Sequence, residues 1–172
     1  MRAFFRREIA NYADYHRDER NALTHAFGIP IIFVAVVLPL DLWTFEAFGL
    51  GLTAADIAVT AVLIAWMLLD PAIGLALVAV SIVLMLIAAA IVANVDTLAV
   101  WLVAAVLFAA GWALQIFGHA HYEHRRPALV DNPVHLLIGP MFIMAKLMTL
   151  VGLRRDLATL MAERGAAPSA AP

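Results

Sequence analysis

The sequence predicts an all-α, polytopic membrane protein with four transmembrane helices and a fifth apolar segment that is re-entrant, interfacial or spanning. Composition supports this class, because 65% of the 172 residues are hydrophobic, against about 45–50% in soluble domains. Only 14% of the residues are charged. The apolar residues also gather in stretches close to the roughly 20 residues that a helix needs to cross a hydrocarbon core of about 30 Å.

Four apolar stretches are long enough, or nearly so, to cross that core. They are residues 22–40, 53–69, 72–93 and 97–118. The breaks between them carry residues that end helices or favour turns, namely Pro39 with Asp41, the pair Asp70-Pro71, and Asn94 to Asp96. A fifth stretch, residues 134–151, is shorter and contains Lys146.

The length is that of one domain. We expect residues 1–155 to form a single helical transmembrane domain that carries a metal site on its cytoplasmic side. Residues 156–172 are expected to be a short helix end and a disordered tail, because the closing GAAPSAAP has a composition that cannot bury a core.

The basic residues predict the orientation of the chain. All 11 lie before residue 21, at 125–126, or from Lys146 onward. The positive-inside rule therefore places the N-terminus and residues 119–133 in the cytoplasm and the 41–56 connection outside. A fifth crossing would put Arg154 and its neighbour outside, so residues 134–151 are expected to re-enter or lie in the interface, bent at Pro140. The excess of arginine and alanine favours a bacterial inner membrane over endoplasmic reticulum.

Several function classes are excluded or unsupported. The chain has no cysteine, which excludes disulfides, thiolate metal sites and cysteine nucleophiles. Its net charge of -2 gives no indication of nucleic-acid binding. The first 20 residues lack the apolar region of a cleavable signal peptide, and no GxSxG, HExxH or glycine-rich phosphate loop is present.

The six histidines fall on the predicted cytoplasmic side, and spacing separates them into classes. Gln115, His119 and Glu123 recur every four residues, so a helix places them on one face. An imidazole and a carboxylate at this spacing suit iron, zinc or manganese. For His121, His124 and His135 we favour a polar loop at the level of the lipid headgroups.

The second group of polar residues precedes the first span, in YHRDERNALTH. The charged RDER predicts a break in the helix, with Asn21 as the N-cap of the first span. A turn there would bring His16 beside His25. His25 itself has two readings that the spacing leaves open, an interfacial hydrogen-bonded histidine or a functional one. Arg125 and Arg126 are by default inside-facing charges, although arginine also suits the carboxylate of a lipid-like substrate.

These two blocks together carry a resemblance that covers about residues 1–155. YHRDERNALTHAFGIP (15–30) followed by QIFGHAHYEHRRPALVDN (115–132) resembles the membrane-bound 2-hydroxy fatty acid dioxygenase family of fungi and bacteria. The resemblance implies an Fe(II) enzyme that uses O2 to shorten a 2-hydroxy fatty acid by one carbon in alpha-oxidation. It implies that His16, His25 and His119 are iron ligands and that Glu123 is a fourth ligand or a partner of one. The polar residues that it implies to orient ligands or substrate are Asn21, Gln115, Asp131 and Asn132.

Two other classes stay open. A di-iron desaturase or hydroxylase would need more histidines, arranged in HxxxH and HxxHH boxes. A small transporter or scaffold would need no site at all, but a transport path usually leaves ionisable residues at mid-membrane. Within residues 53–118 the acidic residues are only Asp56, Asp70 and Asp96, all at the ends of spans.

Overall fold

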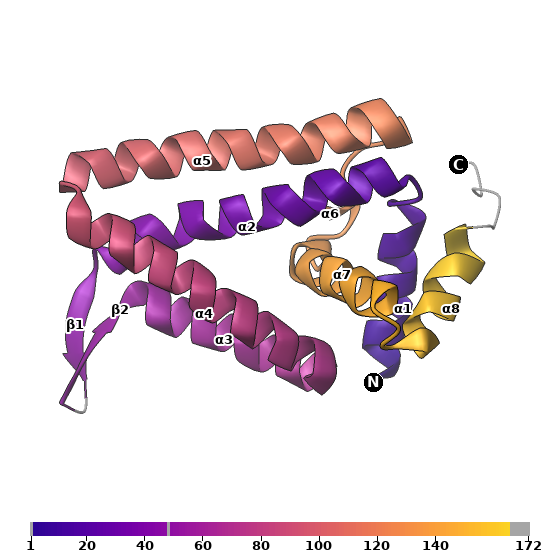
Figure 1. Cartoon of the computed structure of the whole chain (residues 1–172), viewed down its shortest axis with the longest axis horizontal. Helices are drawn as coiled ribbons and strands as arrows, with labels where there is room; N and C mark the ends of the chain where they lie inside the picture. Colours follow the sequence, from indigo (N-terminus) through magenta and orange to yellow (C-terminus); the bar gives the residue numbers. More distant parts are fainter. Residues whose placement is uncertain (1, 48, 166–172) are drawn as a thin grey trace.

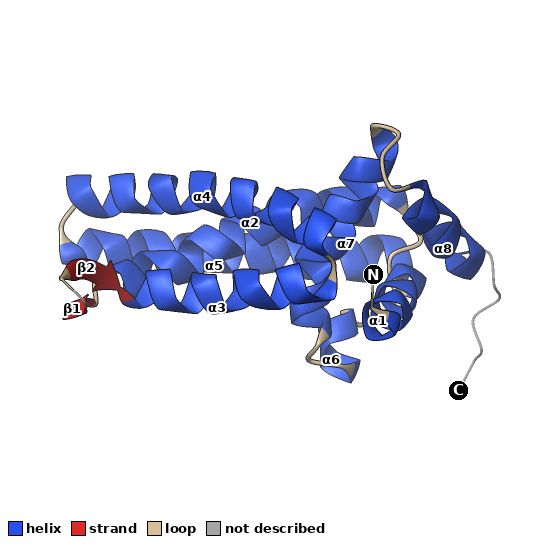
Figure 2. Ribbon diagram, turned by 90° about the horizontal axis from the view of Figure 1, so that it is seen from below, coloured by secondary structure: helices blue, strands red, loops and turns tan. Residues whose placement is uncertain are grey.

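The computed structural model describes residues 2–47 and 49–165, without the side chains of 162–165. Most of this chain is helical, and the helices form one elongated bundle with a cap at one end (Figures 1 and 2). The predicted disordered tail, apart from Gly165, lies outside the described residues.

Three helices are long and apolar enough to cross a membrane. They are α2 (Glu19–Asp41), α4 (Pro71–Asn94) and α5 (Thr97–Gly118), the last extended to Glu123 by a short π-helical turn. The predicted span 53–69 corresponds to α3 (Ala54–Leu69), whose 16 residues rise only about 24 Å. The described part of the chain therefore has three candidate spans, or four if the bent pair α7–α8 counts as one, and four plus a fifth is not confirmed.

The predicted breaks are real helix ends: α2 ends at Asp41, after continuing through Pro39, and the other two breaks carry a side-chain cap. Asp70 accepts a hydrogen bond from the backbone N–H of Ile73 at the start of α4, and Asp96 does the same for α5. For α2 the predicted cap was wrong. Asp18 caps the helix, and Asn21 lies inside its first turn, fully buried, because its amide is used in the site described below.

The 41–56 connection contains strands that the all-α prediction missed. β1 (Thr44–Ala47) and β2 (Leu50–Thr53) form an antiparallel hairpin in which Thr44 pairs with Thr53. The turn uses Gly49 at φ 74°, a backbone conformation that glycine adopts without steric cost. This hairpin lies at the end of the bundle opposite both described chain ends (Figure 1).

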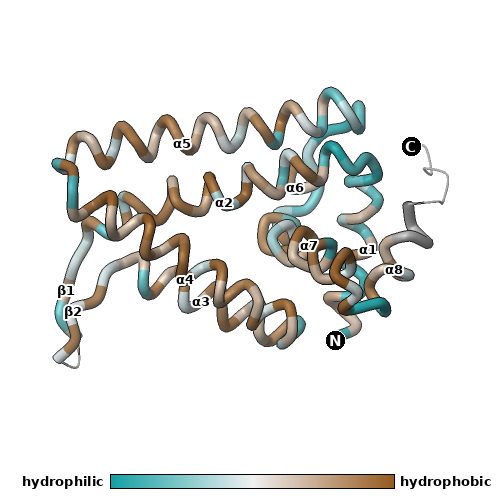
Figure 3. Tube along the Cα trace, viewed as in Figure 1, coloured by the Kyte–Doolittle hydropathy of each residue, from teal (hydrophilic) through white to brown (hydrophobic). Residues whose placement is uncertain are grey.

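The capping end is polar and is built from four helices around the ends of α2 and α5 (Figure 3). They are α1 (Ala3–Asp14), α6 (Ala128–Asp131), α7 (His135–Leu150) and α8 (Arg155–Gly165). The segments that hold the lysines and arginines all lie at this end. This agrees with the predicted grouping of basic residues on one side of the membrane.

The bend in the fifth apolar segment is not at Pro140. Helix α7 continues through that proline, and the chain instead turns by 117° between α7 and α8. Gly152 and Arg154, both at positive φ, make the turn. The Arg154 guanidinium donates to Asp70 at 2.7 Å, so the end of α7 lies beside the α3–α4 turn and not at the hairpin end.

Helices α2 and α5 approach closely through small residues. A Cβ atom on Gly111 would lie 2.5 Å from the Ile32 side chain and 3.1 Å from the carbonyl oxygen of Gly28. Near the capping end, a Cβ atom on Gly118 would lie 2.2 Å from the Thr24 hydroxyl. Small residues of this kind let two helices pack backbone to backbone in a membrane, and here they fix the distance between the two halves of the site.

Candidate metal centre

Three histidines from distant parts of the sequence meet where α1, α2 and α5 come together. His16 follows α1 in the turn that the RDER segment makes, His25 lies two turns into α2, and His119 follows α5. All three are buried, at 3%, 3% and 2% exposure. Their ring centroids are 4.5 to 4.9 Å apart. The predicted approach of His16 to His25 is confirmed.

Hydrogen bonds to the backbone fix the tautomers of two of these rings. His16 donates from Nδ1 to the Tyr12 carbonyl at 2.9 Å, and His25 donates from Nδ1 to the Asn21 carbonyl at 3.0 Å. A carbonyl oxygen only accepts, so both protons sit on Nδ1 and both Nε2 atoms carry lone pairs. These two Nε2 atoms face one another at 3.1 Å. Two lone pairs at this distance repel unless a cation lies between them.

The donor set fits a metal ion. One nitrogen from each ring lies within 4.8 Å of the others, and Nδ1 of His119 is buried with no hydrogen-bond partner among the described residues. Nitrogen ligands at about 2.1 Å from a metal are roughly 3.0 to 3.4 Å apart in octahedral or tetrahedral sites. The separation of the two Nε2 atoms falls in this range.

The electrostatics of His16 prepare it for this role. Burial lowers the pKa of His16 well below its ordinary value, and the neighbouring His25 lowers it further. The ring is therefore neutral at neutral pH, which is the form that binds metals. Tyr12 stacks on it with a centroid distance of 4.0 Å and holds its plane.

Glu123 does not join the three histidines. The segment His119–Glu123 is a π-helical turn, so the expected α-helical stacking of its two ends does not occur. Oε1 of Glu123 accepts a hydrogen bond from the Asn21 side-chain amide at 3.1 Å and another from the Asp18 backbone N–H at 2.9 Å. Asn21 in turn offers its carbonyl to His25. Glu123 is thus linked to His25 through Asn21, and its role at a metal site stays a prediction.

The other predicted residues divide into two groups. Gln115 is buried beside Gly28, with its Nε2 lacking a partner among the described residues, and it lines a cavity next to the histidines. Asp131 accepts from the Tyr15 hydroxyl at 2.8 Å, and Asn132 donates to Glu8 at 3.2 Å. These two tie the loop after α5 to α1 and its following turn, and no described interaction joins either of them to His16, His25 or His119.

The predicted arginines lie at the surface. Arg125 is exposed, with its guanidinium over the Tyr15 ring at 4.8 Å and a hydrogen bond to the Asp14 carbonyl. Arg126 is exposed as well. Neither lines the cavity beside the histidines.

The polar-loop reading holds for two of the three remaining histidines. His121 and His124 are exposed, and His121 stacks on Phe117. For His135 the reading was wrong, since its side chain is only 4% exposed and lines the same cavity as His25 and His119. The sequence offered one signal for it, a histidine at the first residue of an apolar helix.

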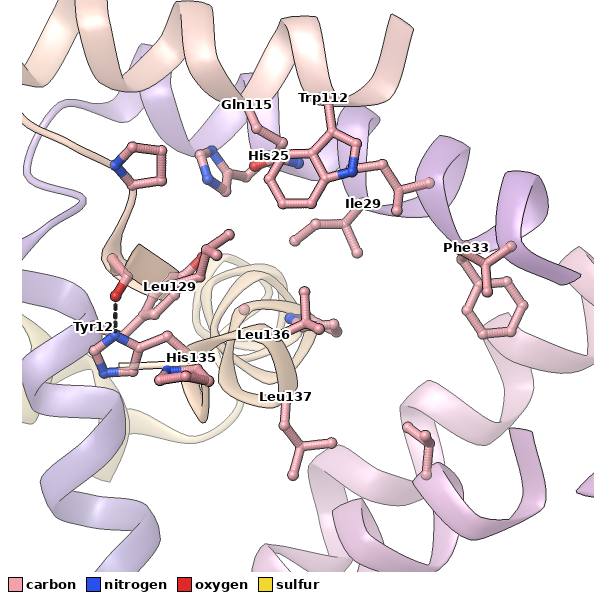
Figure 4. Close-up of a pocket in the computed structure, with 18 of the residues that line it drawn as sticks. Tyr12, His25, Ile29, Phe33, Trp112, Gln115, Leu129, His135, Leu136 and Leu137 are labelled. Carbon is pink, nitrogen blue, oxygen red and sulfur yellow. Dashed lines mark hydrogen bonds between the residues drawn. The ribbon is translucent and has the colours of Figure 1, made fainter. Parts of the chain in front are cut away.

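An apolar cavity of about 430 Å³ adjoins the histidines (Figure 4). His25, His119, Trp112 and Gln115 line its polar end. Tyr12 and His135 also line it, and the remaining lining is apolar and runs along one face of α2, with walls from α3 and α7. The residues of that α2 face are Ile29, Ile32, Phe33, Val36, Val37 and Leu40.

A second pocket of about 410 Å³ contacts one of the three histidines, His16. Its lining combines the charged residues Arg17, Glu19 and Lys146 with apolar side chains such as Phe142. Lys146 donates to Glu19 at 2.9 Å. The histidine cluster therefore adjoins two pockets, the apolar cavity through His25 and His119 and this mixed one through His16.

Comparison with known proteins agrees with this arrangement. No solved structure matches the chain significantly. A curated relative, 2-hydroxy-palmitic acid dioxygenase MPO1 of Saccharomyces cerevisiae, is 47% identical over 47 residues, which are 27% of this chain and 27% of the yeast protein. The chain thus matches about a quarter of the length of that relative. Residues 3–151 match the family described as 2-hydroxy-palmitic acid dioxygenase Mpo1-like. That match includes all three histidines of the cluster, and the chain belongs to the Mpo1-like family.

Proposed function

We propose that this protein is an Fe(II)-dependent dioxygenase that shortens 2-hydroxy fatty acids by one carbon at the cytoplasmic face of a membrane. The observation that carries the proposal is a cluster of three buried imidazoles, two of which, His25 and His119, line the end of a long apolar cavity. Membership of a family named for dioxygenase activity on 2-hydroxy-palmitic acid supports it.

The cavity has the length of a common fatty acid. From His25 to Leu40 the lining face of α2 covers 15 residues, which is about 22 Å at 1.5 Å per residue. An extended acyl chain advances about 1.25 Å per carbon, from a C–C bond of about 1.5 Å and an angle near 111°. The cavity face therefore matches about 16 to 18 carbons. Its polar end receives the hydroxyl and carboxylate groups of the substrate.

The residues around the histidines position and protect the reacting groups. His16, His25 and His119 would hold the iron, which would supply redox chemistry with O2. Asn21 and Tyr12 fix two of the ring planes through their carbonyls. Gln115 has a free amide donor beside the cavity, suited to a substrate oxygen. Zinc or manganese would share this donor set, and metal analysis distinguishes them.

The capping end is the cytoplasmic side in this proposal, in a bacterial inner membrane or, in a eukaryote, the endoplasmic reticulum. The clustering of basic segments at this end supports the orientation. The acyl chain then lies within the bilayer thickness, and its head group meets the histidines at the interface.

A di-iron hydroxylase or desaturase is disfavoured by ligand number. Among the residues that the structure describes, one group of three metal-capable side chains is present, and it supplies three imidazoles. A pair of iron ions needs more ligands than this. An iron count per chain tests the point directly.

The test of the proposal compares His25→Ala and His119→Ala with His121→Ala, a matched change at an exposed histidine. Anaerobically purified proteins are assayed for iron and for conversion of 2-hydroxy-palmitic acid with O2. Loss of both iron and turnover in the first two variants, with both retained in the third, supports the assignment. Retention of iron and activity in His25→Ala and His119→Ala would refute it.

A further inference from the structure

Tyr12 brings a hydroxyl group to the cavity beside the three histidines. Its backbone carbonyl accepts a hydrogen bond from His16 at 2.9 Å, and its ring stacks on the same histidine with a centroid distance of 4.0 Å. The residue is only 5% exposed, and it lines the apolar cavity (Figure 4). Neither of its contacts with His16 uses the hydroxyl group.

The hydroxyl of Tyr12 is unpaired but not enclosed. A phenol can donate one hydrogen bond and accept others, and none is formed by this hydroxyl within the described part of the chain. It is also not one of the described side-chain atoms that lack both a partner and accessible surface. The oxygen therefore keeps surface that another molecule can contact. An unpaired hydroxyl in a buried residue costs free energy, and a ligand oxygen beside it would remove that cost.

The position of the hydroxyl follows from its contact with α7. A Cβ atom on Gly139 would lie 2.9 Å from the hydroxyl oxygen of Tyr12 and 3.6 Å from Cδ1 of Ile29. Both Gly139 and Ile29 line the cavity, and Ile29 lies one helical turn beyond His25 on α2. The hydroxyl oxygen is therefore packed among cavity residues close to the histidines. The missing side chain at Gly139 leaves the space that this oxygen occupies.

The cavity offers no cationic side chain to a bound carboxylate. None of the described residues that line it is a lysine or an arginine. A carboxylate in such surroundings needs hydrogen-bond donors or a metal ion, because burial of an uncompensated charge is costly. Burial raises the pKa of Tyr12 above its ordinary value, so the phenol keeps its proton and remains a donor at neutral pH. A hydrogen bond to a carboxylate is roughly twice as strong as one between neutral groups.

We propose that the Tyr12 hydroxyl donates a hydrogen bond to the carboxylate of the bound fatty acid and thereby selects acids over neutral lipids. This inference rests on the proposed function and adds to it a residue that recognises the head group. No covalent bond changes in this contact. Tyr12 then orients His16 through its carbonyl and the substrate through its hydroxyl, so that one residue aligns the two with each other.

The experiment measures binding in the absence of turnover. Zinc-loaded protein in lipid nanodiscs is titrated with 2-hydroxy-palmitic acid, with palmitic acid, and with the corresponding diol, in which a neutral hydroxymethyl group replaces the carboxylate. Tyr12→Phe removes only the hydroxyl and keeps the ring and the carbonyl. Tyr122→Phe is the same change at a tyrosine that does not line the cavity. Each ligand partitions equally into the lipid of every sample, so ratios of Kd between variants report the contact itself.

We expect Tyr12→Phe to weaken binding of both acids about 10- to 100-fold, the range for a hydrogen bond to a charged group, and binding of the diol only a few-fold. Tyr122→Phe should leave all three affinities unchanged. Gly139→Ala should also weaken acid binding, because its Cβ atom displaces the hydroxyl. In the Tyr12→Phe background this alanine should have little further effect, since the other contacts of its Cβ atom, at 3.5 and 3.6 Å, are ordinary van der Waals distances.

Three results would overturn the inference. They are unchanged affinity of Tyr12→Phe for the acids, equal losses for the acids and the diol, and loss of zinc from Tyr12→Phe, which would show that the hydroxyl serves His16 instead. In each case the proposed function stands if iron-loaded wild type converts 2-hydroxy-palmitic acid with O2. A wild type that neither prefers the acids to the diol nor converts the 2-hydroxy acid contradicts both.

Discussion

If the proposed function is right, the apolar face of α2 limits the length of the bound acyl chain, and two substitutions along it should shift the accepted length by a calculable amount. Ile29 and Val36 both line the cavity, at 4 and 11 residues beyond His25. These offsets place them about 6 and 16 Å from the histidine along the helix. At about 1.25 Å per carbon, Ile29→Trp should block chains beyond roughly 5 carbons and Val36→Trp beyond roughly 13.

The size of the effect follows from geometry and not from lost hydrophobic contact, because methylenes expelled from the cavity enter lipid. A 16-carbon chain stopped at Val36→Trp must withdraw its head group by about three carbons, or roughly 4 Å. A misplacement of 1 Å at a reacting centre already costs about 100-fold. We therefore expect at least that loss in kcat/KM for 16 carbons, and little change for 12.

The assay follows products from a series of 2-hydroxy acids of increasing length by mass spectrometry. The two cut-offs should differ by about eight carbons, since seven residues of helix rise about 10.5 Å. Ile57→Trp is the control, because Ile57 is 55% exposed on α3 and does not line the cavity. An equal loss of kcat/KM at every chain length in both variants would refute a length limit set by α2 and would indicate general disruption of the fold.

Three further outcomes are expected. Asn21→Leu leaves the buried end of Glu123 without its amide partner and should lower metal affinity about 10- to 100-fold, measured by competition with a chelator; unchanged affinity would contradict the role given to Asn21. Arg154→Ala strips Asp70 of its buried counter-charge and should destabilise the fold by about 2 to 3 kcal/mol, measured in chemical denaturation, whereas a change near zero would show that capping of α4 suffices for Asp70. In metal-free protein the pKa of His16 is depressed, so the unfolded state binds more protons than the folded state. Stability should therefore fall as pH drops below about 6.5. His16→Gln should flatten that fall, as measured by thermal melts over a series of pH values.

Much of the candidate centre could be predicted from the sequence because its signals are local and chemical. The RDER segment cannot continue an apolar helix, so a turn between His16 and His25 followed from charge alone. The placement of His119 beside them followed from the predicted topology, since the four expected crossings would return the chain to the same side. A family resemblance carried by two separated blocks then joined these halves, and the described geometry has all three rings in contact.

The errors have a common cause, which is tertiary contact. Asn21 is of a residue type that often caps helices, but its side-chain amide donates a hydrogen bond to Glu123, more than a hundred residues away in the sequence. Asp18 caps the helix instead. His135 looked like a loop residue because its partners, Glu8 and the Ala128 carbonyl, are invisible in local spacing. The π-helical turn at His119–Glu123 likewise has no pattern that distinguishes it from the end of an α-helix.

The number of spans was the least predictable property. Hydropathy marks residues 53–69 and 134–151 as apolar, but it does not show whether an apolar helix crosses a bilayer or packs inside the protein. Helix α7 buries Ile138, Met141, Phe142 and Ala145 almost completely. Its apolar residues serve the core beside the histidines, and this explains why an apolar segment with Lys146 does not run parallel to the others (Figure 1).

The close packing of Gly118 against Thr24 has a consequence for how the protein is made. His16 and His25 leave the ribosome together with the first long apolar helix, whereas His119 follows the last one, and the two are brought into register only when α2 and α5 meet. A nascent or truncated chain that ends before α5 holds two imidazoles with opposed lone pairs and no third ligand. A metal ion held by all three histidines would therefore be loaded late in biogenesis, and a chain that retains the ion would report that its first and last long apolar helices have assembled.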